Sequence, residues 1–321
     1  MQNREKDVKY CGVDREKIRK ANPVIPDYDL KLFVHWIEER YKIHLKKDVN
    51  HEDKPWTEDP ILQTYRFTNV RREHDRQTKY LIDNIVNNPD LTLEEKILNN
   101  ILFRYWNVWD SMKSLGGPWK EKDLKSGSAI KKAEKLYDPD KAYFTNVFYT
   151  SGTKRMLRKE FHIENFAIGV LHLGQEAVKR GIPQAILKAE DPIKICKILQ
   201  TLPGIAGFLS YQIFVDCTYI PEFPFSENEF TVAGPGCKKG IDCLFSDKDG
   251  MTYEECIFWI KDNITKISDI NPKKLMTDLP KEDRFLSVMS LENCFCEFSK
   301  YHRTFYEEGK PRNKYKPFEK E

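Results

Sequence analysis

The chain has 321 residues, of which 40% are hydrophobic and 12% aromatic, and its 53 Lys and Arg against 50 Asp and Glu give a formal charge of +3. This composition excludes a mainly disordered protein, and the length suits either two ordinary domains or one large helical unit of two lobes. A near-balanced charge taken alone argues against a polyanionic partner. The basic residues are unevenly placed, however, so basic segments that converge on one face would still form a cationic channel for DNA.

The sequence carries no signal for export or membrane insertion. Its first residues lack the apolar core of a secretory signal, and no apolar run approaches the ~20 residues that span a bilayer. We therefore expect a soluble intracellular protein, cytoplasmic or nuclear depending on the host.

Eight scattered cysteines favour reduced thiols over a disulfide framework. The spacings of Cys294 with Cys296 and of Cys237 with Cys243 suit zinc poorly, so we predict no metal and no cofactor.

Apolar residues recur at helical spacing along most of the chain, which predicts a mainly α protein. Helices are expected over 29–45 and 288–306, after capping boxes that begin at Thr92 and Thr252, and after Asp191-Pro192. Residues 119–135 carry six lysines against three acids and are expected to be exposed and partly flexible. Strand signals are few, the best being a weak alternation over 142–150.

These patterns suggest three parts. We expect an N-terminal extension (1–27), a helical catalytic domain of two lobes (28–309) and a basic C-terminal tail (310–321). A helix-hairpin-helix is expected near 193–219, within the second part.

Arginines alternate with aromatic residues between positions 55 and 76. Guanidinium groups suit phosphates, and the rings offer surfaces on which a base can stack. The same arginines could instead pair with Glu73 and Asp75 on a solvated helix. The residues concerned are Trp56, Tyr65, Phe67, Arg66, Arg71, Arg72 and Arg76.

The segment Leu202-Pro-Gly204-Ile205 lies between two expected helices. A tight hairpin of this kind points backbone N–H groups outward at a helix N-terminus, which is a geometry that binds phosphate. It resembles the helix-hairpin-helix of DNA glycosylases, which grips the DNA backbone without reading sequence. The alternative is an ordinary connection between buried helices. Phe208 stands where bifunctional glycosylases have a lysine, so a Schiff-base lyase is not supported.

A polar cluster follows the hairpin. In the glycosylases a carboxylate stands at a comparable distance after the hairpin, and here that interval reaches Glu227 and Glu229, either of which could also be merely solvated. Next comes a Gly-rich turn that enters a helix, with Gly234, Gly236, Cys237, Lys238 and Lys239. A thiol at a helix N-terminus beside two lysines would have a lowered pKa, and the turn would suit a phosphate. The alternative is that Cys237 packs inward. The spacing is not that of a Walker loop, so ATP hydrolysis is not indicated.

Several motifs fall in the order of a known family. They are the 55–76 segment, Phe103-Arg-Tyr-Trp-Asn107, the 202–205 hairpin, Glu227-Asn-Glu with Gly234-Pro-Gly-Cys237, and Glu292-Asn-Cys-Phe-Cys-Glu-Phe-Ser-Lys-Tyr301. Together they resemble the α-glutamyl/putrescinyl thymine pyrophosphorylase family of DNA base-hypermodification proteins, which is related to the helical domain of 5-hydroxymethyluracil DNA kinases. The resemblance spans roughly residues 28 to 315.

The resemblance implies a two-lobed helical fold similar to helix-hairpin-helix DNA glycosylases, acting on hypermodified thymine in double-stranded DNA. The implied reaction displaces phosphate from phosphorylated 5-hydroxymethyluracil by the amine of an amino acid or polyamine. A separate 5-hydroxymethyluracil DNA kinase would make that substrate. The base would have to be flipped out of the helix.

Roles can be assigned on that basis. Expected catalytic residues are Glu229, Glu227, Asp59 and Cys237; expected substrate-binding residues are Trp56, Tyr65, Asn69, Arg72, Arg104 and Asn107; and expected contacts to the DNA backbone are Leu202, Gly204, Ile205, Gly234, Gly236, Lys238, Lys239 and the basic tail. Buried pairs of Arg72 with Asp75 or of Arg104 with Glu297 would explain the same residues structurally. Two other functions stay open: a DNA glycosylase that excises a modified pyrimidine, using Glu227 or Glu229, and a non-enzymatic reader of modified DNA.

Overall fold

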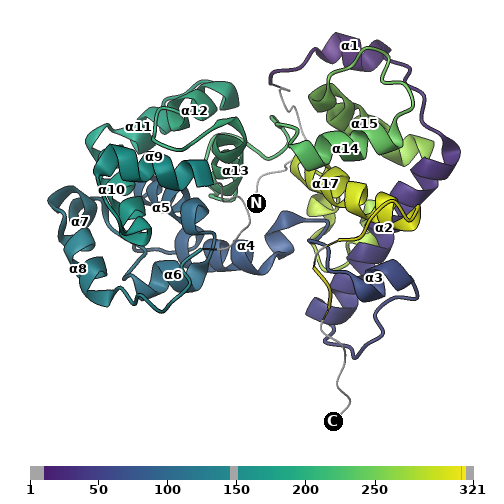
Figure 1. The fold of residues 1–321 in the computed structure, drawn as a ribbon. Coiled ribbons are helices and arrows are strands. Elements are labelled where there is room, and N and C mark those ends of the chain that lie inside the picture. Colours follow the sequence, from purple (N-terminus) through teal and green to yellow (C-terminus); the bar gives the residue numbers. More distant parts are fainter. Residues whose placement is uncertain (1–10, 145–150, 312, 316–321) are drawn as a thin grey trace. The chain divides into compact units, whose positions relative to one another are not determined.

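The computed structural model describes residues 11–144, 151–311 and 313–315. Within these ranges the chain is helical, and β pairing is limited to two isolated bridges, Val24 with Asp247 and Tyr65 with Lys314 (Figure 1). The prediction of a mainly α protein is confirmed. Most of the weakly alternating stretch 142–150 lies outside the described residues.

The chain forms two compact units. Unit 1 comprises Arg76–Ser226, and unit 2 comprises Gln2–Asp75 together with Glu227–Glu321. Unit 2 is therefore built from the two ends of the chain, while unit 1 is built from its middle.

Unit 2 has a core between its early and its late helices. Phe33 on α2 stacks on Phe295 of α17 with ring centroids 4.9 Å apart, and Phe298 meets the same ring edge-on at 5.0 Å. In Figure 1 the purple helix α2 accordingly lies beside the yellow helix α17. The helical segments are α1 (Arg15–Lys20), α2 (Asp27–His44), the π-helical η1 (Leu45–Val49), α3 (Pro60–Thr64), the 3-10 turn η2 (Arg72–His74), α14 (Pro235–Leu244), α15 (Tyr253–Ile267), α16 (Pro272–Leu275), the 3-10 turn η4 (Lys281–Asp283) and α17 (Val288–Phe305).

Two glycines let α14 approach α17 closely. A Cβ at Gly236 would lie 2.5 Å from the Cys296 Sγ, and one at Gly240 would collide with the backbone carbonyl of Phe295. Gly240 therefore permits an approach of the two backbones that any larger residue would obstruct, whereas a larger residue at Gly236 would require the Cys296 side chain to move.

Unit 1 packs its long helix α5 against α10, α11 and α13. Gly174 allows the approach of α10, because a Cβ there would lie 2.9 Å from a methyl carbon of Leu102 on α5. The segments are α4 (Arg76–Leu81), the π-helical η3 (Ile82–Val86), α5 (Leu93–Trp106), α6 (Trp109–Ser114), α7 (Glu121–Ser126), α8 (Ser128–Leu136), α9 (Ser151–Phe161), α10 (Phe166–Lys179), α11 (Ile182–Leu187), α12 (Pro192–Leu199) and α13 (Gly207–Thr218).

The expected helix starts are confirmed. Thr92 caps the backbone N–H of Glu95 at 3.2 Å while the Glu95 carboxylate accepts from the Thr92 N–H at 3.1 Å, and Thr252 and Glu255 repeat this reciprocal pair. Asp191 caps α12, whose first residue is Pro192.

Residues 119–135 are exposed over much of their surface, as expected, but they are more regular than the expectation of an irregular segment. They form α7 and α8, which bury Leu124, Ile130 and Ala133, and Trp119 just before them is 3% exposed. The lysines occupy the solvent-facing sides of these two helices, so their number reflects the exposed face and not a loss of structure.

Two further expectations concern cysteines and membranes. All eight cysteines are free, which agrees with reduced thiols. Among the helices of the described residues, none combines the length and the apolar character that crossing a membrane requires.

The described part of the C-terminal tail pairs with the segment after α3. The Arg66 N–H donates to the carbonyl of Asn313 at 2.9 Å, and the Tyr315 N–H donates to the carbonyl of Thr64 at 3.0 Å. These residues of the tail are thus held against unit 2; residue 312 and residues 316–321 lie outside the described part.

Candidate functional site

Segment 69–75 carries polar side chains into the interior of unit 2. Arg71 is 1% exposed, and its Nη1 donates to the carbonyls of Asp283 and Phe285, each at 2.9 Å. Its Nε donates to Glu73 at 2.5 Å, and its Nη2 lies 3.8 Å from the Glu227 carboxylate. The guanidinium is therefore used within the protein, and the expectation that Arg71 offers its charge to a phosphate finds no support in these contacts.

Asn69 lies in the same segment, 7% exposed. Its Oδ1 accepts from Arg40 at 2.7 Å, and its Nδ2 donates to Asp75 at 3.1 Å. Burial raises the pKa of Asp75 to about 6, although the Asn69 backbone N–H and the charges of Arg40 and Arg72 act in the opposite direction. The amide that was expected to read a pyrimidine edge is thus held by two charged neighbours.

Glu292, near the start of α17, is a buried carboxyl that sequence reasoning assigned no role. It is 4% exposed, and burial raises its pKa to about 7, while the Gly234 N–H, 3.4 Å from its Oε1, and the charge of Arg72 act to lower it. A carboxyl with this pKa exchanges its proton near neutral pH, which is what a general acid or base requires. Arg72 itself is 5% exposed.

The Gly-rich turn does begin a helix, since Gly234 is the N-cap of α14. The backbone N–H groups before the helix meet carboxylates: Ala233 donates to Glu254 at 3.0 Å and Gly234 donates to Glu292. Cys237 is fully buried, and burial raises the pKa of its thiol well above the ordinary value. The expected lowering of this pKa was therefore wrong, and the inward-packing alternative holds, because desolvation outweighs the helix terminus.

The remaining residues of this turn and the acids before it differ in exposure. Lys238 and Lys239 are exposed, and the Lys238 ammonium lies 5.4 Å from the Tyr253 ring centroid. Glu227 is 2% exposed, whereas Glu229 is partly exposed and its carbonyl accepts from the Cys11 N–H at 2.7 Å.

Asp59 is the N-cap of α3, and its carboxylate contacts two backbone N–H groups and two side chains. Its Oδ1 accepts from the backbone N–H groups of Ile61 and Leu62 at 2.8 and 2.9 Å, and its Oδ2 accepts from the Tyr301 hydroxyl at 2.6 Å and lies 3.1 Å from His35 Nε2. Burial acts to raise its pKa, but these hydrogen bonds prevail and lower it. The contacts explain Asp59 as a structural residue, since a carboxylate with a lowered pKa is a weak base.

Two expected substrate ligands, Arg104 and Asn107, lie in unit 1. Arg104 is 3% exposed and holds the fully buried Asp216 with two hydrogen bonds, Nε to Oδ2 at 2.7 Å and Nη2 to Oδ1 at 2.5 Å. Its Nη1 donates to Asn107 Oδ1 at 2.8 Å. The partner of Arg104 is Asp216, not Glu297, whose carboxylate accepts from Lys300.

The 200–206 segment joins α12 to α13 in unit 1. Leu202 and Ile205 are buried at 2% and 6% exposure, and Gly204 has φ +79°, a left-handed conformation that favours glycine. The carbonyl of Pro203 accepts from the Tyr105 hydroxyl at 2.7 Å, which ties this turn to α5.

A pocket of about 400 Å³ opens beside α3 in unit 2. Trp56 and Tyr315 form an edge-to-face pair on it with centroids 6.0 Å apart, and the Lys54 ammonium lies 5.2 and 5.1 Å from these two rings. Lys314 also lines the pocket and lies 5.6 Å from the ring of Tyr65, which is 7% exposed. Aromatic faces beside ammonium groups suit a planar anionic ligand. A larger hollow of about 680 Å³ along α1 and α15 contains none of the expected site residues.

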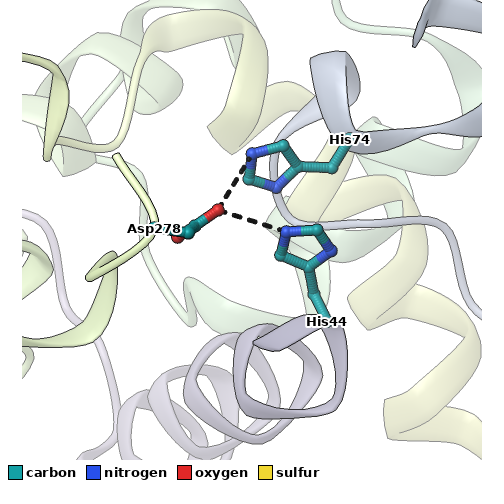
Figure 2. Close-up of side chains that lie close together, drawn as sticks. All are labelled: His44, His74 and Asp278. Carbon is teal, nitrogen blue, oxygen red and sulfur yellow. Dashed lines mark hydrogen bonds and ion pairs between the residues drawn. The ribbon is translucent and has the colours of Figure 1, made fainter. Parts of the chain in front are cut away.

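A group that sequence reasoning did not find is formed by His44, His74 and Asp278 (Figure 2). The Asp278 Oδ2 lies 3.2 Å from His44 Nε2 and 3.5 Å from His74 Nε2. Burial and the neighbouring His44 lower the pKa of His74 to about 4. Burial opposes ionisation of Asp278, but hydrogen bonds from His44 and Tyr41 lower its pKa to about 2. His44 and Asp278 are 234 positions apart, and no local motif links them.

Comparison with known proteins shows the family to which the chain belongs. Residues 28–310 match the family described as the helical domain of 5-hmdU DNA kinase, and the chain belongs to that family. It is 24% identical over 313 residues to a 5-hmdU DNA kinase of Bacillus phage SP10, a match that covers 92% of this chain and 48% of that protein. The chain thus spans about half the length of this curated relative. No solved structure matches the chain.

Proposed function

We propose that the chain is a DNA-modifying enzyme that transfers an amino acid or polyamine onto phosphorylated 5-hydroxymethyluracil in DNA. The main support is its membership of the helical-domain family of 5-hmdU DNA kinases. The name of the phage relative ties that protein to the same hydroxymethylated base. This proposal includes the finer assignment of the present chain to the α-glutamyl/putrescinyl thymine pyrophosphorylases, with a helix-hairpin-helix glycosylase-like fold.

The reaction exchanges one bond for another at the 5-methylene carbon. The amine lone pair forms the new C–N bond while the C–O bond to phosphate breaks, and phosphate leaves with that electron pair. The ammonium proton of the product then passes to a base. Catalysis requires a flipped base, positive charge for the leaving phosphate and a proton acceptor.

The pocket beside α3 is the observation that most favours a bound nucleotide. Its two rings offer stacking surfaces, and Lys54 and Lys314 supply charge for a phosphate. About 400 Å³ lies within the range of ordinary small-ligand sites. In this proposal Trp56 stacks on the flipped base.

The proton acceptor is assigned to Glu229. Among the expected catalytic carboxylates, Asp59 already accepts four hydrogen bonds and Glu227 lies buried beside Arg71, whereas Glu229 is partly exposed. Backbone contacts to DNA are assigned to the turn at 202–205, to Lys238 and Lys239 and to the basic tail, and Arg72 is assigned to the leaving phosphate.

The test is incubation of the chain with double-stranded DNA that contains 5-hydroxymethyluracil or its phosphorylated form, together with candidate amines, followed by mass analysis of the nucleosides. An amine-bearing thymidine with loss of phosphate supports the transferase. Abasic sites identify a glycosylase, and unchanged nucleosides with retained DNA binding identify a reader; either result refutes the transfer reaction.

Two variants test the assigned residues. Glu229→Gln should abolish the product while preserving DNA binding, and wild-type turnover in that variant would remove Glu229 from the mechanism. Trp56→Ala should weaken binding of modified DNA by about 1–3 kcal/mol if the ring stacks on the base. Trp259→Ala, which removes a partly buried tryptophan outside the pocket, is the matched control.

A further inference from the structure

His44, His74 and Asp278 come from three separate segments of unit 2. His44 is the last residue of α2, His74 is the last residue of η2, and Asp278 lies in the connection after α16. Figure 2 shows both imidazoles facing the same carboxylate. Their ligand atoms all lie within 4.8 Å of one another, and in the part of the chain that the structure describes no other three His, Cys, Asp or Glu residues satisfy this condition.

We propose that these three side chains bind one divalent transition-metal ion, with Zn²⁺ as the expected occupant. Ligand bonds of roughly 2.0–2.1 Å at tetrahedral angles place neighbouring ligand atoms about 3.3–3.4 Å apart. The Asp278 Oδ2 lies 3.2 and 3.5 Å from the two Nε2 atoms. Two imidazoles select zinc and its neighbours over Mg²⁺ or Ca²⁺, which prefer oxygen ligands.

The surroundings of the three ligands match those of a metal site. His44 Nδ1 lies 3.2 Å from the Asp48 carboxylate, a contact provided by the π-helical turn η1, so Nδ1–H can donate there while Nε2 faces the ion. The second oxygen of Asp278 accepts from the Tyr41 hydroxyl at 2.7 Å, which fixes the carboxylate. The charge of the ion would be met by the Asp278 carboxylate, whereas Asp48 also pairs with the Lys47 ammonium at 3.2 Å.

The group is largely shielded from water but retains an opening. His44 is 2% and His74 9% exposed, and the side chain of Asp278 is 10% exposed. Three protein ligands leave a coordination position for water or a bound oxygen.

Binding requires one local change. The two imidazole rings stack with centroids 4.0 Å apart and planes 14° apart, and their nitrogen lone pairs lie in those planes. One ring must turn for both lone pairs to meet the same ion. His74 is the ring that can turn at low cost, because its buried Nδ1 has no hydrogen-bond partner to lose. The ion would hold the 3-10 turn η2, and therefore its first residue Arg72, against α2.

The proposal is tested on the full chain, treated with a chelator, kept reduced, and then loaded with Zn²⁺. After desalting, one zinc per chain should remain, and excess Zn²⁺ should raise Tm by roughly 5 °C. His74→Asn and Asp278→Asn should abolish retention. Asp48→Asn should weaken affinity about 10–100-fold while preserving the stoichiometry, because its carboxylate only orients His44. His172→Gln, on α10 in unit 1, is the matched control and should bind like wild type.

A His74→Asn or Asp278→Asn variant that fails to fold would also fail to bind zinc. The Co²⁺ complex of the wild-type chain therefore provides an independent measurement. Its visible bands should be those of nitrogen and oxygen ligands, without thiolate-to-cobalt charge transfer. Zinc retention far below one per chain, wild-type affinity in both triad variants, or a thiolate band from the cysteines would each overturn the assignment.

Discussion

The buried carboxyl of Glu292 should make the stability of unit 2 depend on pH. Burial raises its pKa from 4.5 to about 7. Below pH 4.5 Glu292 is protonated in both the folded and the unfolded state, and it contributes no pH dependence. Between pH 4.5 and 7 the unfolded chain releases the proton while the folded chain keeps it, so the free energy of unfolding falls as pH rises. Above pH 7 both states are ionised and the loss is complete.

The size of the effect follows from the pKa difference. About 2.5 pKa units at 1.36 kcal/mol each give about 3 kcal/mol, an upper limit because water that enters on ionisation lowers the cost. Glu292→Gln keeps an oxygen for the Gly234 N–H but cannot ionise. The variant should therefore gain up to about 3 kcal/mol over wild type between pH 4.5 and pH 7.5.

The assay is urea unfolding of the full chain across this pH range, with pulsed hydrogen exchange on peptides of α17 so that unit 2 is followed separately. Glu222→Gln, which changes an exposed glutamate of unit 1, is the control and should leave these curves unchanged. If Glu292→Gln and wild type show parallel pH dependences, the carboxyl is ionised in the folded protein and the reasoning fails.

Three further predictions concern packing and pairing. Arg104→Met should lower the free energy of unfolding by about 3–5 kcal/mol, because it leaves the Asp216 carboxylate buried without its cation. Adding Asp216→Leu in the same chain should recover most of this loss in urea unfolding. An unchanged urea midpoint in Arg104→Met would contradict a structural role for the pair. Gly240→Ala should lower the free energy of unfolding by at least about 1–3 kcal/mol, because its methyl group collides with the α17 backbone. The control Gly207→Ala, whose methyl group meets nothing within 4 Å, should be nearly neutral in calorimetry. Equal Tm values for the two variants would refute the close approach of α14 and α17. Asp59→Asn should lower the urea midpoint at pH 7. Because folding lowers the pKa of Asp59, the stability that the variant loses relative to wild type should shrink as pH falls below 3.8. A loss of stability that stays constant with pH would show that the charge of Asp59 plays no part.

Local sequence signals predicted the helices and their starts. The capping boxes at Thr92 and Thr252 and the proline after Asp191 act over three or four residues, so they are readable without tertiary structure. The regularity of residues 119–135 was missed because lysine content was given more weight than the apolar positions Leu124, now on α7, and Ile130 and Ala133, now on α8.

The candidate site was less predictable because its chemistry depends on distant partners. Arg104 meets a carboxylate 112 positions away, and nothing near Arg104 in the sequence distinguishes a phosphate ligand from this buried pair. The thiol of Cys237 was judged by its place at a helix start, but its pKa is set mainly by burial against neighbouring elements. The His44, His74 and Asp278 group, spread over three segments, has no local signal at all.

Because unit 2 is assembled from both ends of the chain, its order of folding during synthesis is constrained. The Phe33 ring cannot reach its partner Phe295 until the 262 positions from one to the other have been synthesised, which at about 5–20 residues per second takes roughly 13 to 52 seconds. Unit 1 is contiguous and is complete well before that. During this interval unit 1 is complete, but the apolar face of α2 still lacks its partner α17, and a chaperone would be most needed then.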